Sequence, residues 1–131
     1  MATLILAIAA LYAAAQAFFC LAQPDAVAAL LGLSLDTALA RSEFMTAYGG
    51  IYAGMAVFFA LGLVRASLKE GGVAFLALAA TGATLARLWT VAVLPLGLGS
   101  VLFVLAAELV LALLGWLGWR AEWRRAVRAT V

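Results

Sequence analysis

Four long apolar runs divide this chain of 131 residues, and each is long enough to cross a lipid bilayer as a helix. They cover about residues 2–22, 43–64, 71–94 and 99–119. The composition agrees, because 69% of the residues are hydrophobic and only 11% are charged, which is far from the usual range for a water-soluble domain. We therefore expect an all-α polytopic membrane protein, with residues 1–131 forming a single bundle of four transmembrane helices.

A short interfacial helix is expected between the first two runs. The segment PDAVAALLG places Pro24 where a first helical turn begins and Gly32 where a helix ends. Ser34 or Asp36 can then cap the next helix. If that helix begins near Asp36 and continues to the end of the second run, it rises about 43 Å, more than a hydrocarbon core of about 30 Å. Its first turns, which carry Arg41, should therefore lie among the lipid headgroups.

The basic residues are distributed unevenly along the chain. The two connections on one side of the expected membrane carry only Arg41. Six basic residues lie in the other connection, 65–70, and in the tail after Trp119: Arg65, Lys69, Arg120, Arg124, Arg125 and Arg128. By the positive-inside rule, both termini are then cytoplasmic. The tail, residues 120–131, is expected to lie along the inner leaflet as a basic amphipathic segment in contact with membrane lipid, and nucleic acid is not an expected partner.

Two charged residues lie inside apolar runs, Arg87 in the third and Glu108 in the fourth. Counted from the short turn PLGLG between these runs, they lie about 10 Å and about 13 Å below the outer end of their helices. Antiparallel helices joined by a short turn normally pack side by side, so we expect a salt bridge between the two. An unpaired charge at the bilayer centre costs roughly 2.5–3.5 kcal/mol, which is a second reason for the two to pair.

Other polar residues fall in the same outer half of the membrane. Gln16 lies in the first run, Tyr48 in the second and Thr84 in the third, so each expected helix contributes a polar group to one level. Glu43 can pair locally with Arg41 at the headgroups or turn inward as a second carboxylate. Together with the charged pair they form the candidate ligand-binding set: Arg87, Glu108, Glu43, Tyr48, Gln16 and Thr84.

The second run contains the stretch RSEFMTAYGGIYAG, in which Gly50-x-x-x-Gly54 is a close-packing motif and Gly49 adds a further notch. By α-helical spacing, Glu43, Ala47, Gly50 and Gly54 share one face. We interpret the three glycines as helix-packing residues.

Taken together, these features resemble those of a known family. The chain has four spans, an acidic residue shortly before Tyr48-Gly49-Gly50, an arginine late in the third span and a glutamate within the fourth. This arrangement resembles a bacterial family of small four-helix inner-membrane proteins of unknown function, similar in arrangement to DoxX-like proteins. The resemblance covers nearly the whole chain. It implies a four-helix fold and a place in the bacterial inner membrane, but no activity.

Several chemistries are excluded by residue type. The chain has no histidine and a single cysteine, Cys20, so no His/Cys metal site can form within one chain. It also has no phosphate-binding G-x-x-x-x-G-K-[ST] loop and no Ser/His/Asp triad. We expect neither a metal nor a cofactor. Catalysis stays undecided, because an arginine and a carboxylate suit many reactions and are diagnostic of none.

Three functions remain open from the sequence. The first, which we favour, is the binding or conversion of a lipophilic molecule with a polar head, in which Arg87 orients an anionic or carbonyl oxygen and Glu108 or Glu43 exchanges a proton. The second is a small oligomeric, proton-linked transporter that uses Glu108. The third is a structural or accessory membrane subunit in which the charged pair only fixes the helix register. The ligand's identity and the formation of a homo-oligomer stay open.

Overall fold

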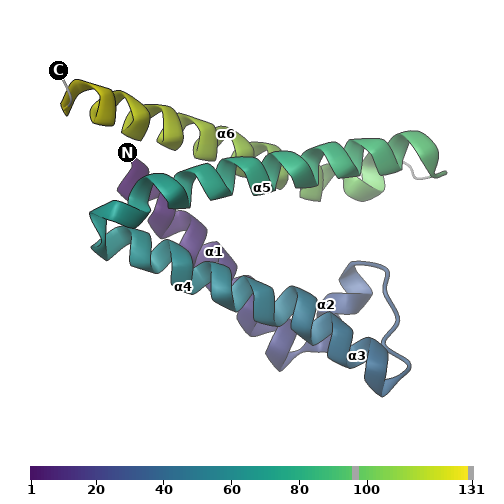
Figure 1. Ribbon diagram of the computed structural model, residues 1–131. Helices are drawn as coiled ribbons and strands as arrows, with labels where there is room; N and C mark the ends of the chain where they lie inside the picture. Colours follow the sequence, from purple (N-terminus) through teal and green to yellow (C-terminus); the bar gives the residue numbers. More distant parts are fainter. Residues whose placement is uncertain (96–97, 130–131) are drawn as a thin grey trace. The chain divides into compact units, whose positions relative to one another are not determined.

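The computed structural model describes residues 1–95 and 98–129. It is 90% helical, with no strand in the part of the chain that it describes. The elements are α1 (Ala2–Ala22), α2 (Pro24–Leu30), α3 (Ala38–Phe44), the π-helix η1 (Met45–Gly50), α4 (Ile51–Val64), α5 (Ala66–Val93) and α6 (Leu98–Ala129) (Figure 1). The predicted all-α class is confirmed.

Four helical stretches among the described residues are long and apolar enough to cross a membrane. They are Ala2–Ala22, Ala38–Val64, Ala66–Val93 and Val101–Arg128. The short helix expected after the first span is α2. The chain is therefore a multi-pass membrane protein by the length and composition of its helices.

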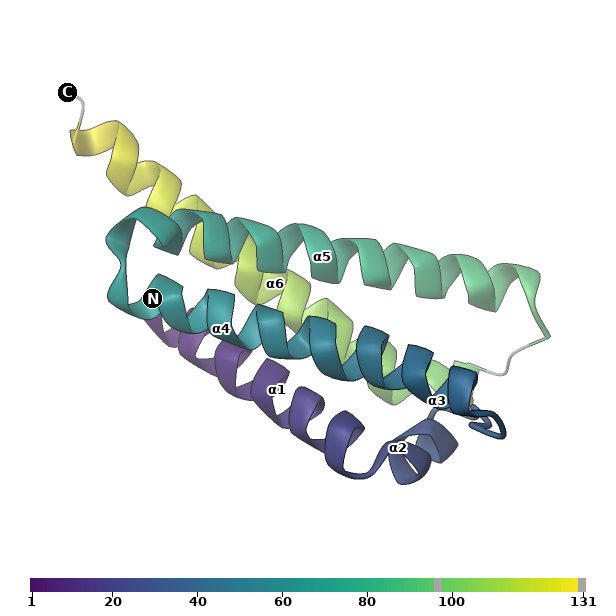
Figure 2. The same ribbon diagram turned by 60° about the horizontal axis from the view of Figure 1, so that its bottom comes forward.

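The chain divides into two compact units, which we call the α5–α6 unit (Met1–Leu6 with Gly62–Val131) and the α1–α4 unit (Ala7–Leu61). In the α5–α6 unit the two long helices run antiparallel and lie side by side (Figures 1 and 2). α5 ends at Val93 because Leu94 is extended, with φ −110° and ψ 151°, as is favoured before Pro95. The expected turn PLGLG includes residues 96 and 97, which lie outside the described residues.

Glycine allows α5 and α6 to approach closely. A Cβ atom added at Gly115 would lie 2.5 Å from the backbone N and 2.6 Å from the Cα of Ala77, so no side chain fits there. Three residues later, a Cβ at Gly118 would lie 3.0 Å from Val73 Cγ1 and 3.1 Å from Ile5 Cδ1. Small residues that bring backbones together are typical of helix packing in membranes. The α5–α6 contact therefore depends on two glycines that the sequence did not distinguish from others.

The tail expected to follow the fourth span is the last part of α6. The helix continues from Leu98 to Ala129, with no break after Trp119 (Figure 1). Residues 119–129, WRAEWRRAVRA, contain no glycine or proline and are rich in the good helix formers Ala, Arg and Glu. The basic residues after Trp119 thus prolong the fourth span and do not form a separate helix. Residues 130 and 131 lie outside the described part.

In the α1–α4 unit, α1 presents a stripe of small buried residues. They are spaced four apart: Ala9, Ala13 and Ala17. The rings of Tyr12 on α1 and Tyr52 on α4 contact edge to face, with their centroids 6.4 Å apart. Small residues on one face again allow close helix packing.

The connection between α1 and α3 follows part of the expected pattern. Pro24 begins α2, and Gly32, which follows the end of α2, has a φ of +70° that glycine adopts without strain. The cap of the next helix differs from the prediction, because Thr37 caps α3 by accepting a hydrogen bond from the backbone N of Ala40 at 3.0 Å. Ser34 and Asp36, the expected caps, hydrogen-bond to each other instead.

A π-helix interrupts the second span, where a continuous α-helix was expected. η1 covers MTAYGG, Met45–Gly50, between α3 and α4. A π-helix bonds each backbone N–H to the carbonyl five residues back, so it holds more residues per turn than an α-helix. Residues before η1 are thereby rotated relative to those after it. The face shared by Glu43 and Gly54, predicted from α-helical spacing, does not form.

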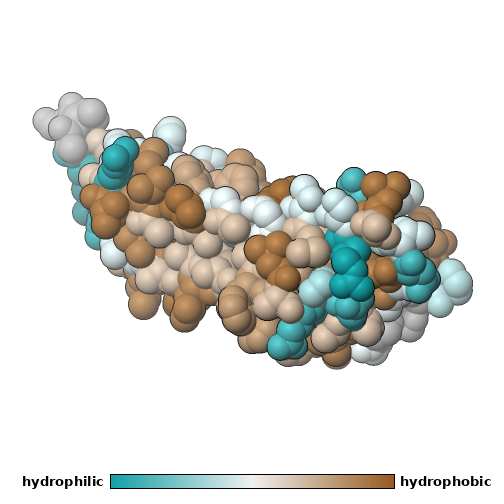
Figure 3. Space-filling model, turned by 90° about the horizontal axis from the view of Figure 1, so that it is seen from below, coloured by the Kyte–Doolittle hydropathy of each residue, from teal (hydrophilic) through white to brown (hydrophobic). Residues whose placement is uncertain are grey.

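Many large apolar side chains point outward instead of into a core. Leu11, Phe103 and Leu113 are 74%, 86% and 60% exposed. Apolar residues, in brown, dominate the face seen in Figure 3. Exposure of this kind is unfavourable in water at about 25 cal/mol per Å², whereas lipid tails are as apolar as leucine. The outward side chains of both units therefore fit a lipid environment.

Candidate functional site

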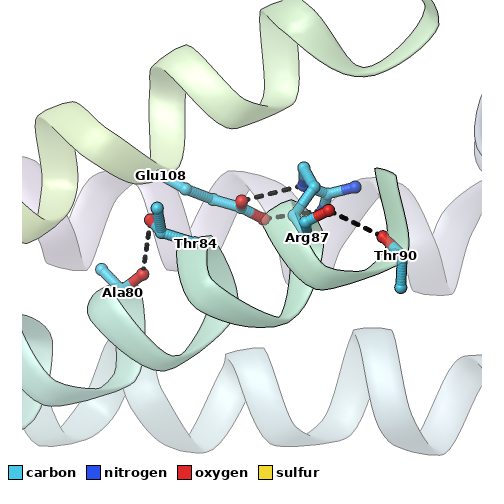
Figure 4. A network of polar contacts seen from close by, with 5 residues as sticks. All are labelled: Ala80, Thr84, Arg87, Thr90 and Glu108. Carbon is cyan, nitrogen blue, oxygen red and sulfur yellow. Dashed lines mark hydrogen bonds and ion pairs between the residues drawn. The ribbon is translucent and has the colours of Figure 1, made fainter. Parts of the chain in front are cut away.

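The ion pair expected between Arg87 and Glu108 is present in the α5–α6 unit. Arg87 Nε donates to Glu108 Oε2 at 2.8 Å, and Arg87 Nη2 donates to Glu108 Oε1 at 2.7 Å (Figure 4). Two parallel charge-assisted hydrogen bonds of this kind are the strong, geometrically specific form of an ion pair. The Arg87 side chain is 30% exposed and that of Glu108 is 15% exposed. The pair is therefore only partly covered by protein.

The register of α5 and α6 explains how the two side chains meet. The close contact of Gly115 with Ala77 puts the two Cα atoms at one level, and from there Arg87 lies ten residues along α5 and Glu108 seven residues back along α6. The offset of three residues corresponds to about 4.5 Å. Side chains on a helix lean toward its N-terminus, so Glu108 leans toward the level of Arg87. This lean and the long arginine side chain close the gap.

Two threonines of α5 lie close to Arg87 in the sequence, but their hydroxyls bond within their own helix. Thr84 Oγ1 donates to the carbonyl of Ala80 at 2.9 Å, and Thr90 Oγ1 donates to the carbonyl of Arg87 at 2.8 Å (Figure 4). Thr84 is 6% exposed. Such back-bonding is the usual way for a threonine to satisfy its hydroxyl inside a helix. The proposed role of Thr84 in ligand binding stays a prediction.

Gln16 and Tyr48 belong to the α1–α4 unit. Gln16 Nε2 lies 3.7 Å from Cys20 Sγ, in a weak hydrogen bond along α1. Tyr48, in η1, stacks on Phe44 with the ring centroids 4.9 Å apart and the planes at 24°. Each side chain therefore has a local contact, and the proposed role of both in ligand binding stays a prediction.

Glu43 does not pair with Arg41, the first of its two expected arrangements. Arg41 instead binds Asp25, with Nη2 donating to Oδ1 at 2.6 Å and Nη1 donating to Oδ2 at 2.9 Å. Within the described residues, Glu43 has no ion pair, and its side chain is exposed. Asp25 was not a candidate, because its distance in sequence from Arg41 hides the contact.

The three glycines of the second span differ in their surroundings. A Cβ at Gly49 would lie 2.5 Å from Leu21 Cδ2, so this glycine packs against α1. A Cβ at Gly50 or Gly54 would have nothing within 4 Å among the described residues, and a packing role for these two stays a prediction. Gly50 lines a hollow of about 530 Å³ beside η1, together with six other residues: Leu21, Ala38, Arg41, Ser42, Met45 and Thr46.

We searched the described part of the chain for side chains that could together bind a metal ion. No group of three or more His, Cys, Asp or Glu side chains there is placed to hold a metal ion. The Arg87–Glu108 pair itself offers a guanidinium fork and a carboxylate. It can bind and orient a polar group.

Comparison with known proteins identifies a family but no activity. No curated protein and no solved structure matches the chain significantly. A family described as "Domain of unknown function (DUF4345)" matches residues 1–127, which is nearly the whole chain. The four apolar helices and the length of this match lead to one conclusion: the chain belongs to the DUF4345 family.

Proposed function

We propose that the Arg87–Glu108 pair is the polar part of a binding site for a lipophilic molecule with a polar head. The observation that supports this is a bidentate charge pair, only partly covered, on two apolar membrane-spanning helices. Replacing a buried ion pair by apolar residues is often neutral or even stabilising. Packing of these two helices therefore does not require an ion pair, and a charged pair suits the binding of a polar group.

The chemistry of the pair defines the class of ligand. A guanidinium group presents several N–H donors in one plane, which match carboxylate, phosphate or carbonyl oxygens. Exposed apolar side chains near this level of both helices suit a lipophilic body: Leu85, Leu88 and Leu109. The ligand enters from the lipid phase. One of its oxygen atoms replaces a Glu108 oxygen as the hydrogen-bond acceptor of Arg87, and its apolar part lies along the two helices.

The test compares the molecules that copurify with three forms of the protein in one detergent. These are the wild type, the double variant Arg87→Leu/Glu108→Leu, and the matched control Asp25→Leu/Arg41→Leu, which removes the other bidentate pair. Extraction and mass spectrometry should find a species held by the wild type and the control but reduced about tenfold in the first variant, a loss of about 1.4 kcal/mol in binding. Identical contents in all three folded proteins would show that the pair only joins two helices.

We also propose that residues 1–131 form one transmembrane domain in a bacterial inner membrane, with both termini in the cytoplasm. The excess of Lys and Arg at residues 65–70, where α4 ends and α5 begins, and after Trp119 supports this orientation. Reporter fusions after residues 70 and 131 should then read cytoplasmic, and one inserted near residue 96 should read exterior. A cytoplasmic signal from the insertion near residue 96 would reverse the assignment of leaflets.

A further inference from the structure

The last turns of α6 carry a hollow lined by aromatic and basic side chains. Its volume is about 310 Å³, and five residues line it: Trp116, Trp119, Arg120, Trp123 and Arg124. Their spacing of three and four residues places them on one face of the helix. We call this surface the Trp–Arg groove. It lies within the α5–α6 unit, away from the Arg87–Glu108 pair along α6.

Hydrogen bonds and stacking fix the aromatic side of the Trp–Arg groove. The rings of Trp116 and Trp119 stack, with centroids 5.1 Å apart and planes at 28°. Trp116 Nε1 donates to Thr81 Oγ1 at 3.0 Å, and Thr81 Oγ1 donates in turn to the carbonyl of Ala77 at 2.7 Å. The Trp116 indole is thus held to α5 before any ligand arrives. Such preorganisation lowers the entropy lost on binding.

The groove has an excess of positive charge. On a neighbouring face of α6, Arg125 forms an ion pair with Glu122 at 2.9 Å. Arg120 and Arg124 have no ion-pair partner within the described residues. Glu70 does not line the groove but a separate hollow, of which Trp123 also forms part. A ligand of complementary charge therefore carries a negative group.

The length of α6 places the groove at the membrane surface. α6 has 32 residues, which corresponds to about 48 Å, whereas the hydrocarbon core is about 30 Å thick. Its basic end therefore reaches the headgroups in either orientation of the chain. Tryptophan is enriched at this depth because its ring is apolar and its N–H is polar.

We propose that the Trp–Arg groove binds the headgroup of one anionic phospholipid. The lipid phosphate lies between Arg120 and Arg124, whose guanidinium groups donate to its oxygens, and the glycerol and upper acyl carbons lie on the tryptophan rings. The acyl chains continue along the exposed apolar side chains of α6. The volume of the hollow is at the lower end of the range for ligand sites and suits a headgroup, not a whole lipid.

The experiment uses tryptophan fluorescence quenched by lipids with brominated acyl chains. A Trp89→Phe background removes the one tryptophan outside the groove, so that only Trp116, Trp119 and Trp123 report. The protein is reconstituted in phosphatidylcholine vesicles that contain an increasing fraction of brominated phosphatidylglycerol or of brominated phosphatidylcholine. At low ionic strength, half-maximal quenching should need about thirtyfold less phosphatidylglycerol, as expected for two arginines near an anionic headgroup.

Two double variants distinguish lipid binding in the Trp–Arg groove from attraction of anionic lipid by the net positive charge of the protein. Arg120→Gln/Arg124→Gln should abolish the preference for phosphatidylglycerol. The matched control Arg65→Gln/Arg128→Gln removes the same charge from positions that do not line the groove and should keep the preference. Equal quenching by the two lipids in the background protein would overturn the proposal. So would an equal loss of preference in both double variants, which would mean that the net charge and not the groove attracts the lipid.

Discussion

The chain contains two arginine–carboxylate pairs with nearly the same hydrogen bonds in different surroundings. Arg87 and Glu108 join α5 to α6 at 2.7 and 2.8 Å, and Arg41 and Asp25 join α3 to α2 at 2.6 and 2.9 Å. Both residues of the first pair lie well inside membrane-spanning stretches, and their side chains are 30% and 15% exposed. In the second pair only Arg41 belongs to such a stretch, close to its start, and the side chains are 43% and 65% exposed. The two pairs therefore have similar bond lengths, but their charged groups would be solvated very differently if the partner were removed.

The solvation of the remaining charge determines how much each pair contributes to the stability of the protein. Asp25 and Arg41 are well exposed, so either can be hydrated when the other is removed, and exposed pairs contribute about 0–1 kcal/mol. Glu108 is largely covered on an apolar helix, so a lost partner leaves a charge with little solvation. The comparison teaches that the surroundings of an ion pair, and not its geometry, set the effect of breaking it.

The largest effect is expected from breaking the Arg87–Glu108 pair on one side only. Arg87→Leu and Glu108→Leu should each lower the stability of the detergent-solubilised protein by about 3–5 kcal/mol, because the remaining charge loses its opposite charge on an apolar helix. The double variant should lose less than either single one. Thermal unfolding of the four proteins in the same detergent gives the coupling energy. Losses that simply add would mean that the two side chains act independently.

An intermediate effect is expected at Gly115, which sets the approach of α5 to α6. Gly115→Ala should lower stability by about 1–3 kcal/mol, because its Cβ would overlap the backbone of Ala77. Gly54→Ala is the control in the other unit, where a Cβ would meet nothing within 4 Å among the described residues. Alanine is the better helix former, so this change should be neutral or stabilising by up to about 1 kcal/mol. Thermal unfolding that gave both changes the same sign would contradict the close contact at Gly115.

The smallest effect is expected at the exposed pair. Asp25→Asn should lower stability by no more than about 1 kcal/mol, because Arg41 then binds water. The difference from the wild type should shrink as NaCl is raised from 0.01 to 1 M, since the Debye length falls from about 30 to about 3 Å. Thermal unfolding at the two salt concentrations measures this. A loss as large as that of Glu108→Leu, or one unchanged by salt, would remove the contrast between the two pairs.

The sequence predicts the spans and the Arg87–Glu108 pair for one physical reason. Long apolar runs have few stable arrangements, and two charges placed at one depth in neighbouring runs are strongly driven to meet. The Arg41–Asp25 pair has no such signal, because it depends on the path that the chain takes through Gly32 between α2 and α3. Likewise, the rotation of each helix about its own axis decides which glycine contacts a neighbouring backbone. The sequence does not give this rotation, so it could not identify Gly115 rather than Gly50 or Gly54 as the site of close packing.

The π-helix has a consequence for changes in the length of this protein. A π-helix is equivalent to an α-helix into which one residue has been inserted. Deleting one residue from Met45–Gly50 can therefore leave an unbroken α-helix, whereas the same deletion in α5 would shift half of its side chains away from α6. After such a deletion, α3 would keep its orientation relative to α4, whereas in α5 the residues on one side of the deletion would turn by about 100°, the angle of one α-helical residue. Natural relatives that are one residue shorter in this segment would thus keep an intact second span and still present Arg41 and Glu43 in the same direction.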